Sequence, residues 1–166
     1  MNQKLLKKFS KIKLVLTDVD GVLTDGGMYY SSKGDIMKKF HVRDGMGVNM
    51  LKRNNIPTII VTKEKNPIIR QWAKKMNIAQ TFDGIIEKVK ILDKVSKKYQ
   101  VTYSEILYIG DDINDIELLK KVGISVAPSD AWLETKKIVD YISITSGGCG
   151  VFREISDLIL GYTYKS

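Results

Sequence analysis

Five short runs of the chain are almost continuously apolar, and stretches with a helical pattern of apolar positions separate them. Apolar runs without alternation are typical of strands buried on both faces of a parallel sheet. The predicted strands are Ile12–Thr17, Pro57–Thr62, Ile106–Gly110, Ile124–Ala127 and Val139–Ile144. The predicted helices are Gly47–Asn54, Asn66–Asn77, Glu87–Tyr99, Asp115–Val122, Ala131–Lys137 and Gly150–Leu160. This order predicts an α/β fold with a Rossmann-like, doubly wound parallel sheet.

One segment breaks the rhythm, the stretch GGMYYSSKGDIMKKF from Gly26 to Phe40. Its two extended halves flank the turn sequence SSKGD, which is typical of a β-hairpin. Because the hairpin directly follows the first strand, we expect it to overhang the sheet edge where that strand ends. The chain contains no linker, repeat or low-complexity tract, so we expect one domain over residues 1–166.

The composition of the 166 residues is globular, with 43% hydrophobic and 28% charged residues. No apolar run approaches the ~18 to 20 residues that span a bilayer. The apolar stretch near the N-terminus, Ile12–Leu16, is short and lacks a small-residue cleavage site. Cys149 is the only cysteine, so an internal disulfide cannot form. We therefore expect a cytoplasmic protein with no membrane partner.

The formal net charge is +8, and the lysines are spread along the whole chain. This spread favours a solvated basic surface, and a phosphorylated substrate is the next explanation for the positive potential. Single-stranded nucleic acids are bound by basic surfaces interleaved with aromatic residues, and no such surface is apparent. We expect no nucleic-acid partner.

Acidic residues follow two of the predicted buried strands. Asp18 and Asp20 end the first, in DVDGV, and the sequence GDDINDIELL after the third supplies Asp111, Asp112 and Asp115. Ligands of open α/β sheets bind beyond the carboxyl ends of the strands, so these side chains converge. Such crowding of carboxylates is unfavourable unless a cation binds, and oxygen ligands near a phosphate suit Mg²⁺. DVDGV alone could be an ordinary turn; the second acidic motif favours a metal site.

Four segments, DVDGVLTDG, the Val61-Thr62 pair, Lys88 and GDDIND, occur in an order that resembles the four motifs of the haloacid dehalogenase superfamily of phosphatases. The resemblance covers nearly the whole chain. It implies that Asp18 is the nucleophile that forms an aspartyl-phosphate, and that Asp20 protonates the leaving alcohol and then activates water. It also implies that Thr62 and Lys88 hold the phosphoryl oxygens.

The same resemblance implies a ligand set for Mg²⁺. The ion would be held by the Asp18 carboxylate, the Asp20 backbone carbonyl and Asp111, with Asp112 or Asp115 in support. The positive charge near the phosphoryl group would screen its repulsion from an attacking carboxylate.

Most members of this superfamily carry a separate cap domain, and this chain has no room for one. The segments DGVLTDGGMYY, KKFHVRDGMG, VGISVAPSDA and GGCGVFREI resemble the 3-deoxy-D-manno-octulosonate 8-phosphate phosphatases and their relatives that act on nine-carbon, sialic-acid-type 9-phosphates. Those families are capless homotetramers in which a neighbouring subunit covers the site. The resemblance places the substrate pocket at His41, Val42, Arg43, Asp44 and Gly45. Arg43 would pair with a sugar carboxylate, whereas we expect His41 to pack or hydrogen-bond rather than act as a base.

One departure concerns the substrate. The eight-carbon phosphatases carry Thr-Gly-Arg and a second arginine eight residues on, where this chain has Thr62-Lys63-Glu64 and Trp72. Glu64 would repel a carboxylate but accept hydrogen bonds from a polyol. The nine-carbon relatives have glutamate there and a lysine where Lys75 stands. We therefore favour a nine-carbon ulosonic acid 9-phosphate (KDN or N-acylneuraminate type) as the substrate.

Three alternatives stay open. The segment HVRDGMG favours the eight-carbon (KDO) 8-phosphate instead. A catalytically silent tetramerising domain, related to those fused to sugar-acid cytidylyltransferases, would keep the fold without turnover. A phosphatase of nucleic-acid ends would explain the charge, and steeply salt-dependent binding would reveal it.

Overall fold

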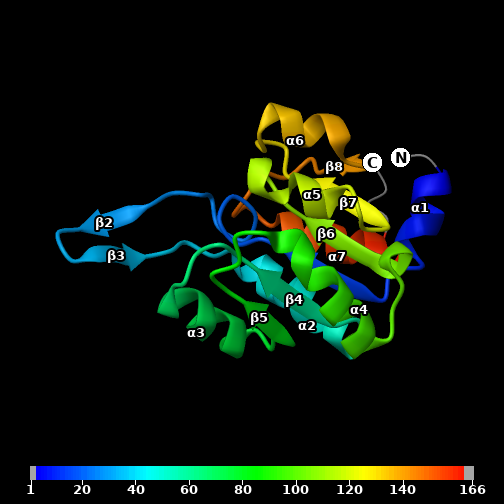
Figure 1. Ribbon diagram of the computed structural model, residues 1–166, viewed down its shortest axis with the longest axis horizontal. Helices are drawn as coiled ribbons and strands as arrows, with labels where there is room; N and C mark the ends of the chain where they lie inside the picture. The colour runs from blue at the N-terminus through cyan, green and yellow to red at the C-terminus, as the bar shows by residue number, and fades with distance from the viewer. Residues whose placement is uncertain (1–2, 163–166) are drawn as a thin grey trace.

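A computed structural model describes residues 3–162 (Figure 1). Its central sheet has parallel strands only. Their order across the sheet is β5 (Gln80–Phe82), β4 (Thr58–Val61), β1 (Leu14–Thr17), β6 (Ile106–Ile109), β7 (Ile124–Ala127) and β8 (Tyr141–Ile142). From β1 the chain first builds one side of the sheet and then the other. The switch point therefore lies between β1 and β6, where ligands of such sheets bind.

Helices cover both faces of the sheet (Figure 1). The α-helices are α1 (Gln3–Phe9), α2 (Val42–Arg53), α3 (Pro67–Lys75), α4 (Leu92–Tyr99), α5 (Ile116–Leu119), α6 (Leu133–Ile138) and α7 (Val151–Ile159). The 3-10 helices are η1 (Lys88–Ile91), η2 (Tyr103–Glu105) and η3 (Ile113–Asp115). One hydrophobic cluster joins the sheet to α1, α2, α3 and α7, and a second joins it to η1, α4 and α5. The predicted doubly wound architecture is confirmed.

The strand β1 shows why the predicted strands are apolar throughout. Successive side chains of a strand point to opposite faces. Val15 accordingly packs into the cluster on the α2 and α7 side, whereas Leu14 and Leu16 pack into the cluster on the α4 side. All three are fully buried. At ~25 cal/mol per Å² of apolar surface, burial on both faces makes this strand a main source of folding free energy.

The predicted β-hairpin is confirmed and protrudes from the sheet edge at which β1 ends (Figure 1). Its strands are β2 (Tyr29–Ser31) and β3 (Gly34–Met37), and Gly34 adopts a positive φ of 104° at the turn. Between Thr62 and Lys88 the chain forms only α3 and β5, so no cap domain is inserted there. No helix of the described part is long and apolar enough to cross a membrane.

The structure differs from the sequence prediction at several elements. Strand β8 covers Tyr141–Ile142 rather than Val139–Ile144, and helix α5 covers Ile116–Leu119 rather than Asp115–Val122. Helix α2 begins at Val42 rather than Gly47, because the His41 side chain caps its first turn. Helix α1 and the half-buried strand β5 are absent from the sequence prediction. The glycines of α2 obscured its start, yet they permit close packing: a Cβ at Gly47 would lie 2.7 Å from Ser156 Oγ of α7.

Candidate active site

A cavity of about 630 Å³ opens at the carboxyl edge of the sheet, beside the switch point. Three strand ends meet around it. The lining includes Asp18 and Asp20 after β1, Thr62 and Glu64 after β4, and Asp111 after β6. The structure therefore brings together Asp18, Asp20 and Asp111, whose convergence the sequence predicts, and places Thr62 and Glu64 beside them.

Lys88 lies beneath this cavity, at the start of η1, with 1% of its side chain exposed. Its Nζ lies 2.6 Å from Asp18 Oδ2 and 2.7 Å from Asp115 Oδ1. Oxygen atoms of Asp18, Asp111 and Asp115 all lie within 4.8 Å of one another. We call these four residues, three aspartates and one lysine, the inner cluster.

Hydrogen bonds from the surrounding backbone and from one tyrosine fix the inner cluster. The Asp18 Oδ1 atom accepts a bond of 2.7 Å from the backbone N–H of Val19. Asp115 Oδ1 accepts a bond from the Tyr108 hydroxyl, in the buried centre of β6. Asp115 Oδ2 accepts a bond of 3.0 Å from the N–H of Asp111. Because both its oxygens are engaged, Asp115 fits a supporting role better than that of a direct ligand.

The electrostatics of the inner cluster fit a divalent cation. Burial, followed by the charge of Asp115, raises the pKa of Asp18 to about 7 despite the nearby Lys88. Burial and the charges of Asp18 and Asp115 raise the pKa of Asp111 to about 8. A cation between Asp18 and Asp111 would remove this repulsion, and carboxylate oxygens are the ligands that Mg²⁺ prefers.

A glycine makes room for Asp111. Gly21 adopts a positive φ of 80°, and a Cβ there would lie 2.0 Å from Asp111 Oδ2. Any larger residue would push the Asp111 carboxylate away from Asp18. The glycine of DVDG therefore has a steric reason as well as a conformational one.

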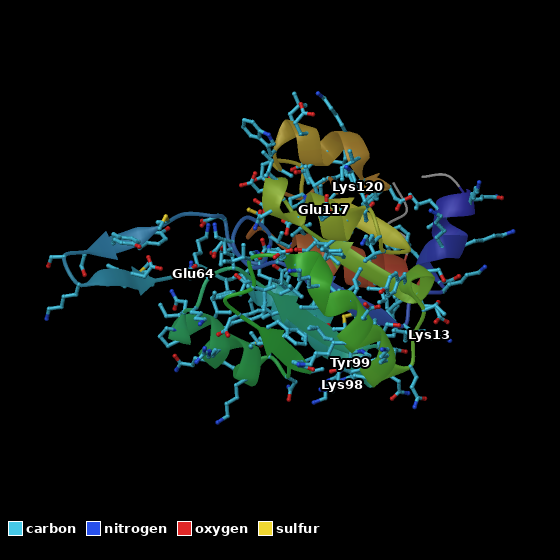
Figure 2. The ribbon with its side chains drawn as sticks, viewed as in Figure 1. Lys13, Glu64, Lys98, Tyr99, Glu117 and Lys120 are labelled. Atoms are coloured by element: carbon cyan, nitrogen blue, oxygen red, sulfur yellow. The ribbon has the colours of Figure 1, made fainter. Side chains whose placement is uncertain are left out.

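A second lysine-centred cluster lies where the hairpin meets the cavity. Lys38, just after β3, places its Nζ 2.8 Å from Asp20 Oδ1 and 2.7 Å from Glu64 Oε2. Asn66 donates bonds of 3.0 Å to Glu64 and 3.1 Å to Asp35 of β3. We call Asp20, Asp35, Lys38 and Glu64 the outer cluster; Figure 2 shows Glu64 at the base of the hairpin.

The outer cluster shifts its two cavity carboxylates in opposite directions. Burial and then the hydrogen bond with Glu64 raise the pKa of Asp20, although Lys38 opposes this. Burial acts to raise the pKa of Glu64, but hydrogen bonds with Asp20, Asn66, Lys38 and Asp35 outweigh it and lower the pKa to about 2. Asp20 therefore holds a proton more readily than Glu64 does, which is the direction that a proton donor needs.

The structure does not bring residues 41–45 to the cavity of this chain. His41 Nδ1 accepts a bond from the N–H of Arg43, so the expected hydrogen-bonding role of His41 is confirmed. Val42 and Arg43 are exposed, and Gly45 packs against Met76. Asp44 is fully buried and accepts a 2.9 Å bond from the N–H of Arg153. Their part in substrate binding stays a prediction.

Three further predicted residues have distinct placements. Thr62 is buried at the end of β4, and its Oγ1 accepts a bond of 3.2 Å from the N–H of Glu64. Asp112 lines the cavity, but its Oδ1 caps η3 by accepting from the N–H of Ile113. Lys75 is exposed at the last residue of α3, the end away from Glu64.

Sequence reasoning missed Lys38, Asp35 and Tyr108. The first two contact Glu64, which lines the cavity, because the hairpin leans toward the loop after β4, and residue spacing carries no signal for that lean. Tyr108 occupies a position in an apolar strand, and nothing in the sequence links its hydroxyl to Asp115, its partner in the structure.

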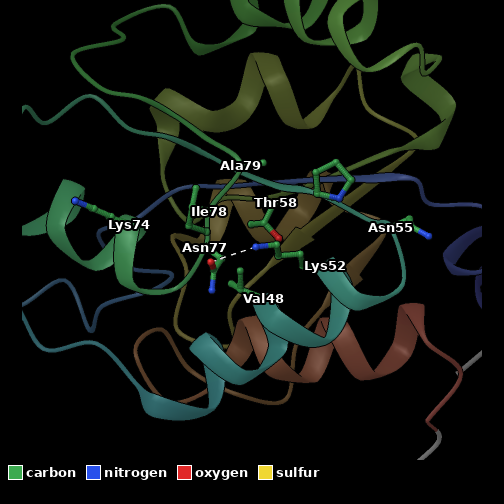
Figure 3. A pocket seen from close by; sticks show the side chains of 9 residues that line it. Val48, Lys52, Asn55, Thr58, Lys74, Asn77, Ile78 and Ala79 are labelled. Carbon is green, nitrogen blue, oxygen red and sulfur yellow. Dashed lines mark hydrogen bonds between the residues drawn. The ribbon is translucent and has the colours of Figure 1, made fainter.

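A second cavity, of about 520 Å³, lies at the opposite edge of the sheet, where β4 begins (Figure 3). Its lining includes Lys52, Thr58, Lys74 and Asn77, and Lys52 Nζ donates a bond of 3.1 Å to Asn77 Oδ1. No carboxylate is among its lining residues. It therefore lacks the carboxylates that could serve as a nucleophile or as metal ligands.

Comparison with known proteins agrees with this geometry. The family model of the haloacid dehalogenase-like hydrolases matches residues 51–155. A 3-deoxy-D-manno-octulosonate 8-phosphate phosphatase of Haemophilus influenzae is 41% identical over 160 residues, which cover 96% of this chain and 89% of the relative.

Solved structures agree as well. The cobalt-bound phosphatase of this name from Haemophilus influenzae has a TM-score of 0.90 at 41% identity, over 93% of this chain and 91% of that one. The one from Moraxella catarrhalis, in complex with magnesium, phosphate and KDO, has a TM-score of 0.93 at 32% identity, over 98% and 94%. The chain therefore belongs to the haloacid dehalogenase-like hydrolases and, within them, to the phosphoric monoester hydrolases related to the 3-deoxy-D-manno-octulosonate 8-phosphate phosphatases.

Proposed function

We propose that this protein hydrolyses the phosphate ester of 3-deoxy-D-manno-octulosonate 8-phosphate, with Asp18 as the nucleophile and Mg²⁺ as the metal. The observation that carries the proposal is the inner cluster, in which Lys88 and two further aspartates surround Asp18 at the switch point of the sheet. Support for this substrate comes from phosphatases of that compound, which are up to 41% identical over almost the whole chain.

The reaction proceeds in two displacements. An Asp18 carboxylate oxygen forms a bond to phosphorus, the ester P–O bond breaks, and the leaving alkoxide takes the proton of Asp20. Asp20 then accepts a proton from a water molecule while the water oxygen attacks phosphorus. The bond between the Asp18 oxygen and phosphorus breaks, and inorganic phosphate is released. Splitting the reaction lets one carboxyl group serve as acid and then as base.

The other residues bind charge and position the reactants. Lys88 neutralises Asp18 and the incoming phosphoryl oxygens, and Thr62 donates to those oxygens from the end of β4. Bound Mg²⁺, held by Asp18, Asp111 and the Asp20 carbonyl with Asp115 in support, would screen the repulsion between carboxylate and phosphoryl group. Lys88 is suited to this role because Asp18 and Asp115, despite the opposing effect of burial, raise its pKa and keep it charged.

A nine-carbon 9-phosphate is the second candidate substrate. The relatives favour the eight-carbon compound, and the sequence-based preference for nine carbons rests on Glu64, which stands where an arginine is expected. Glu64 is held by Lys38 and Asn66, so it offers no positive charge to a sugar carboxylate. Lys63, an exposed residue that lines the same cavity, could offer such a charge.

Parallel kinetics on the two substrates test the proposal. We expect a higher kcat/KM for the octulosonate 8-phosphate than for a nonulosonate 9-phosphate, both with Mg²⁺. The variant Glu64→Arg should widen this preference, and Glu64→Gln, which changes the charge without adding a guanidinium, is its control. A reversed preference in the wild-type protein would make the nine-carbon compound the substrate. Failure to hydrolyse any phosphomonoester would leave only a silent domain.

We also propose that four chains assemble through the hairpin. Its exposed apolar side chains include Tyr30, Ile36 and Met37, which are 50–63% exposed, and such a patch favours burial against a second copy. Light scattering should give the mass of a tetramer for the wild type and a smaller one for Ile36→Glu. Lys33→Glu, at the hairpin tip, is the control. A monomeric wild-type protein would contradict the proposal.

A further inference from the structure

Lys38 is a basic residue on the root of a protruding hairpin, yet only 4% of its side chain is exposed. Charged side chains are almost never buried unless they are paired. The ammonium has two carboxylate partners, Asp20 at 2.8 Å and Glu64 at 2.7 Å. We propose that Lys38 is a positioning residue, which holds the Asp20 carboxyl group in the orientation that proton transfer to the leaving oxygen needs. This inference rests on the proposed function.

Two hydrogen bonds hold one carboxyl oxygen of Asp20 and leave the other oxygen to carry the proton. Asp20 Oδ1 accepts both the Lys38 ammonium and the Thr24 hydroxyl, the latter at 3.1 Å. Two donors on the same oxygen hold the plane of the carboxyl group, and hydrogen bonds from an ammonium are among the stronger ones. The transferable proton must then be carried by Oδ2. Without Lys38, no cation would be left to orient the group, and only the Thr24 hydroxyl and the hydrogen bond with Glu64 would remain.

Lys38 is itself held in place from the body of the protein. The chain of contacts runs from the start of α3, where the Asn66 side chain caps the helix, through Glu64 to Lys38. Asn66 also binds Asp35 of the hairpin. Lys38 thus ties the hairpin to Asp20. The next residue, Lys39, points outward instead: its side chain is 55% exposed, and its Nζ lies 3.1 Å from Asp25 Oδ2. Lys39 is therefore a matched control.

A residue that acts through Asp20 has a distinctive kinetic effect. The rate enhancement that a general acid provides grows with the basicity of the leaving oxygen. Loss of Lys38 should then slow esters with poor leaving groups far more than esters whose leaving group departs without a proton. Loss of a residue that only binds the phosphoryl group or supports the fold would slow all esters by the same factor.

The experiment measures kcat/KM, which reports the steps up to departure of the alcohol. Its substrates are aryl phosphates of graded leaving-group basicity, from p-nitrophenyl to phenyl phosphate, which lack the sugar acid. For Lys38→Met we expect a loss of about tenfold to a hundredfold with phenyl phosphate, and of about threefold or less with p-nitrophenyl phosphate. Lys38→Arg should recover part of the phenyl phosphate rate, and Lys39→Met should match the wild type.

The opposite results are equally clear. A loss in Lys38→Met that is equal across the series, or no loss at all, overturns the inference. If Lys38→Met does not fold, the same comparison is made with Lys38→Gln, which keeps a neutral donor. A wild-type protein that hydrolyses none of the esters contradicts the proposed function itself, whereas active wild-type protein with a flat series contradicts only the role of Lys38.

Discussion

The inner and outer clusters both place a buried lysine between two carboxylates, yet their titration differs. In the inner cluster, burial and mutual repulsion raise the pKa values of both Asp18 and Asp111, to about 7 and about 8. In the outer cluster, the pKa of Asp20 is raised while that of Glu64 is lowered to about 2. A site that disfavours the negative charges of Asp18 and Asp111 is suited to a cation, and two carboxyl groups whose pKa values are driven apart are suited to proton transfer.

The two clusters also differ in how they are built. Strand ends of one sheet deliver Asp18 and Asp111, and Lys88 lies below them at 1% exposure. The outer cluster joins a hairpin to the loop after β4 through Lys38. The inner cluster is therefore fixed by the sheet topology, whereas the outer cluster depends on where a protruding segment leans.

Replacing Asp18 should affect activity far more than any other change and should leave stability intact. Asp18→Asn should lower kcat by about 10³-fold or more, because no amide can form the aspartyl-phosphate. The melting temperature should stay the same or rise, because one like charge leaves a crowded cluster. Steady-state kinetics and calorimetry on the same preparation measure both. Near-normal turnover would mean that another residue is the nucleophile.

A second prediction compares how much each of the two lysines, Lys88 and Lys38, contributes to stability. Lys88→Met should lower the free energy of unfolding by about 3 kcal/mol, because it leaves buried Asp18 and Asp115 without their cation. Lys38→Met should cost less, since the side chains of its partners Asp20 and Glu64 are 35% and 36% exposed. Urea denaturation of both variants gives the comparison. Equal losses would show that the inner cluster is no more dependent on its lysine than the outer one.

The smallest effect probes the support beneath the inner cluster. Tyr108→Phe removes the hydroxyl that donates to Asp115 Oδ1, while Lys88 still binds that oxygen. We expect a loss of about 1 kcal/mol of stability and a reduction of a few-fold in kcat. Denaturation and kinetics measure the two effects. A stability equal to that of the wild type would show that this hydrogen bond contributes nothing net.

The parts of the molecule that could be predicted are those fixed by burial and topology. The strands β1, β4, β6 and β7 are buried on both faces, so each appears in the sequence as an apolar run. Because β1 and β6 are adjacent and parallel, the sheet brings Asp18 and Asp111 together at its edge.

What could not be predicted depends on weak local signals or on contacts between distant segments. Strand β5 has three half-buried residues, without an apolar run. The start of α2 depends on a single capping bond from the His41 side chain. The pairing of Lys38 with Asp20 and Glu64 arises from the direction in which the hairpin leaves the sheet, and spacing along the chain does not encode it.

If the inner cluster holds a divalent cation between Asp18 and Asp111, calorimetric titration should detect Mg²⁺ binding. We expect the wild-type protein to bind Mg²⁺ with a matching rise in melting temperature. The variant Asp111→Asn should lose both effects, whereas Asp93→Asn, on α4, should keep them. Equal Mg²⁺ binding by the wild type and Asp111→Asn, or none by the wild type, would show that the inner cluster is not a metal site.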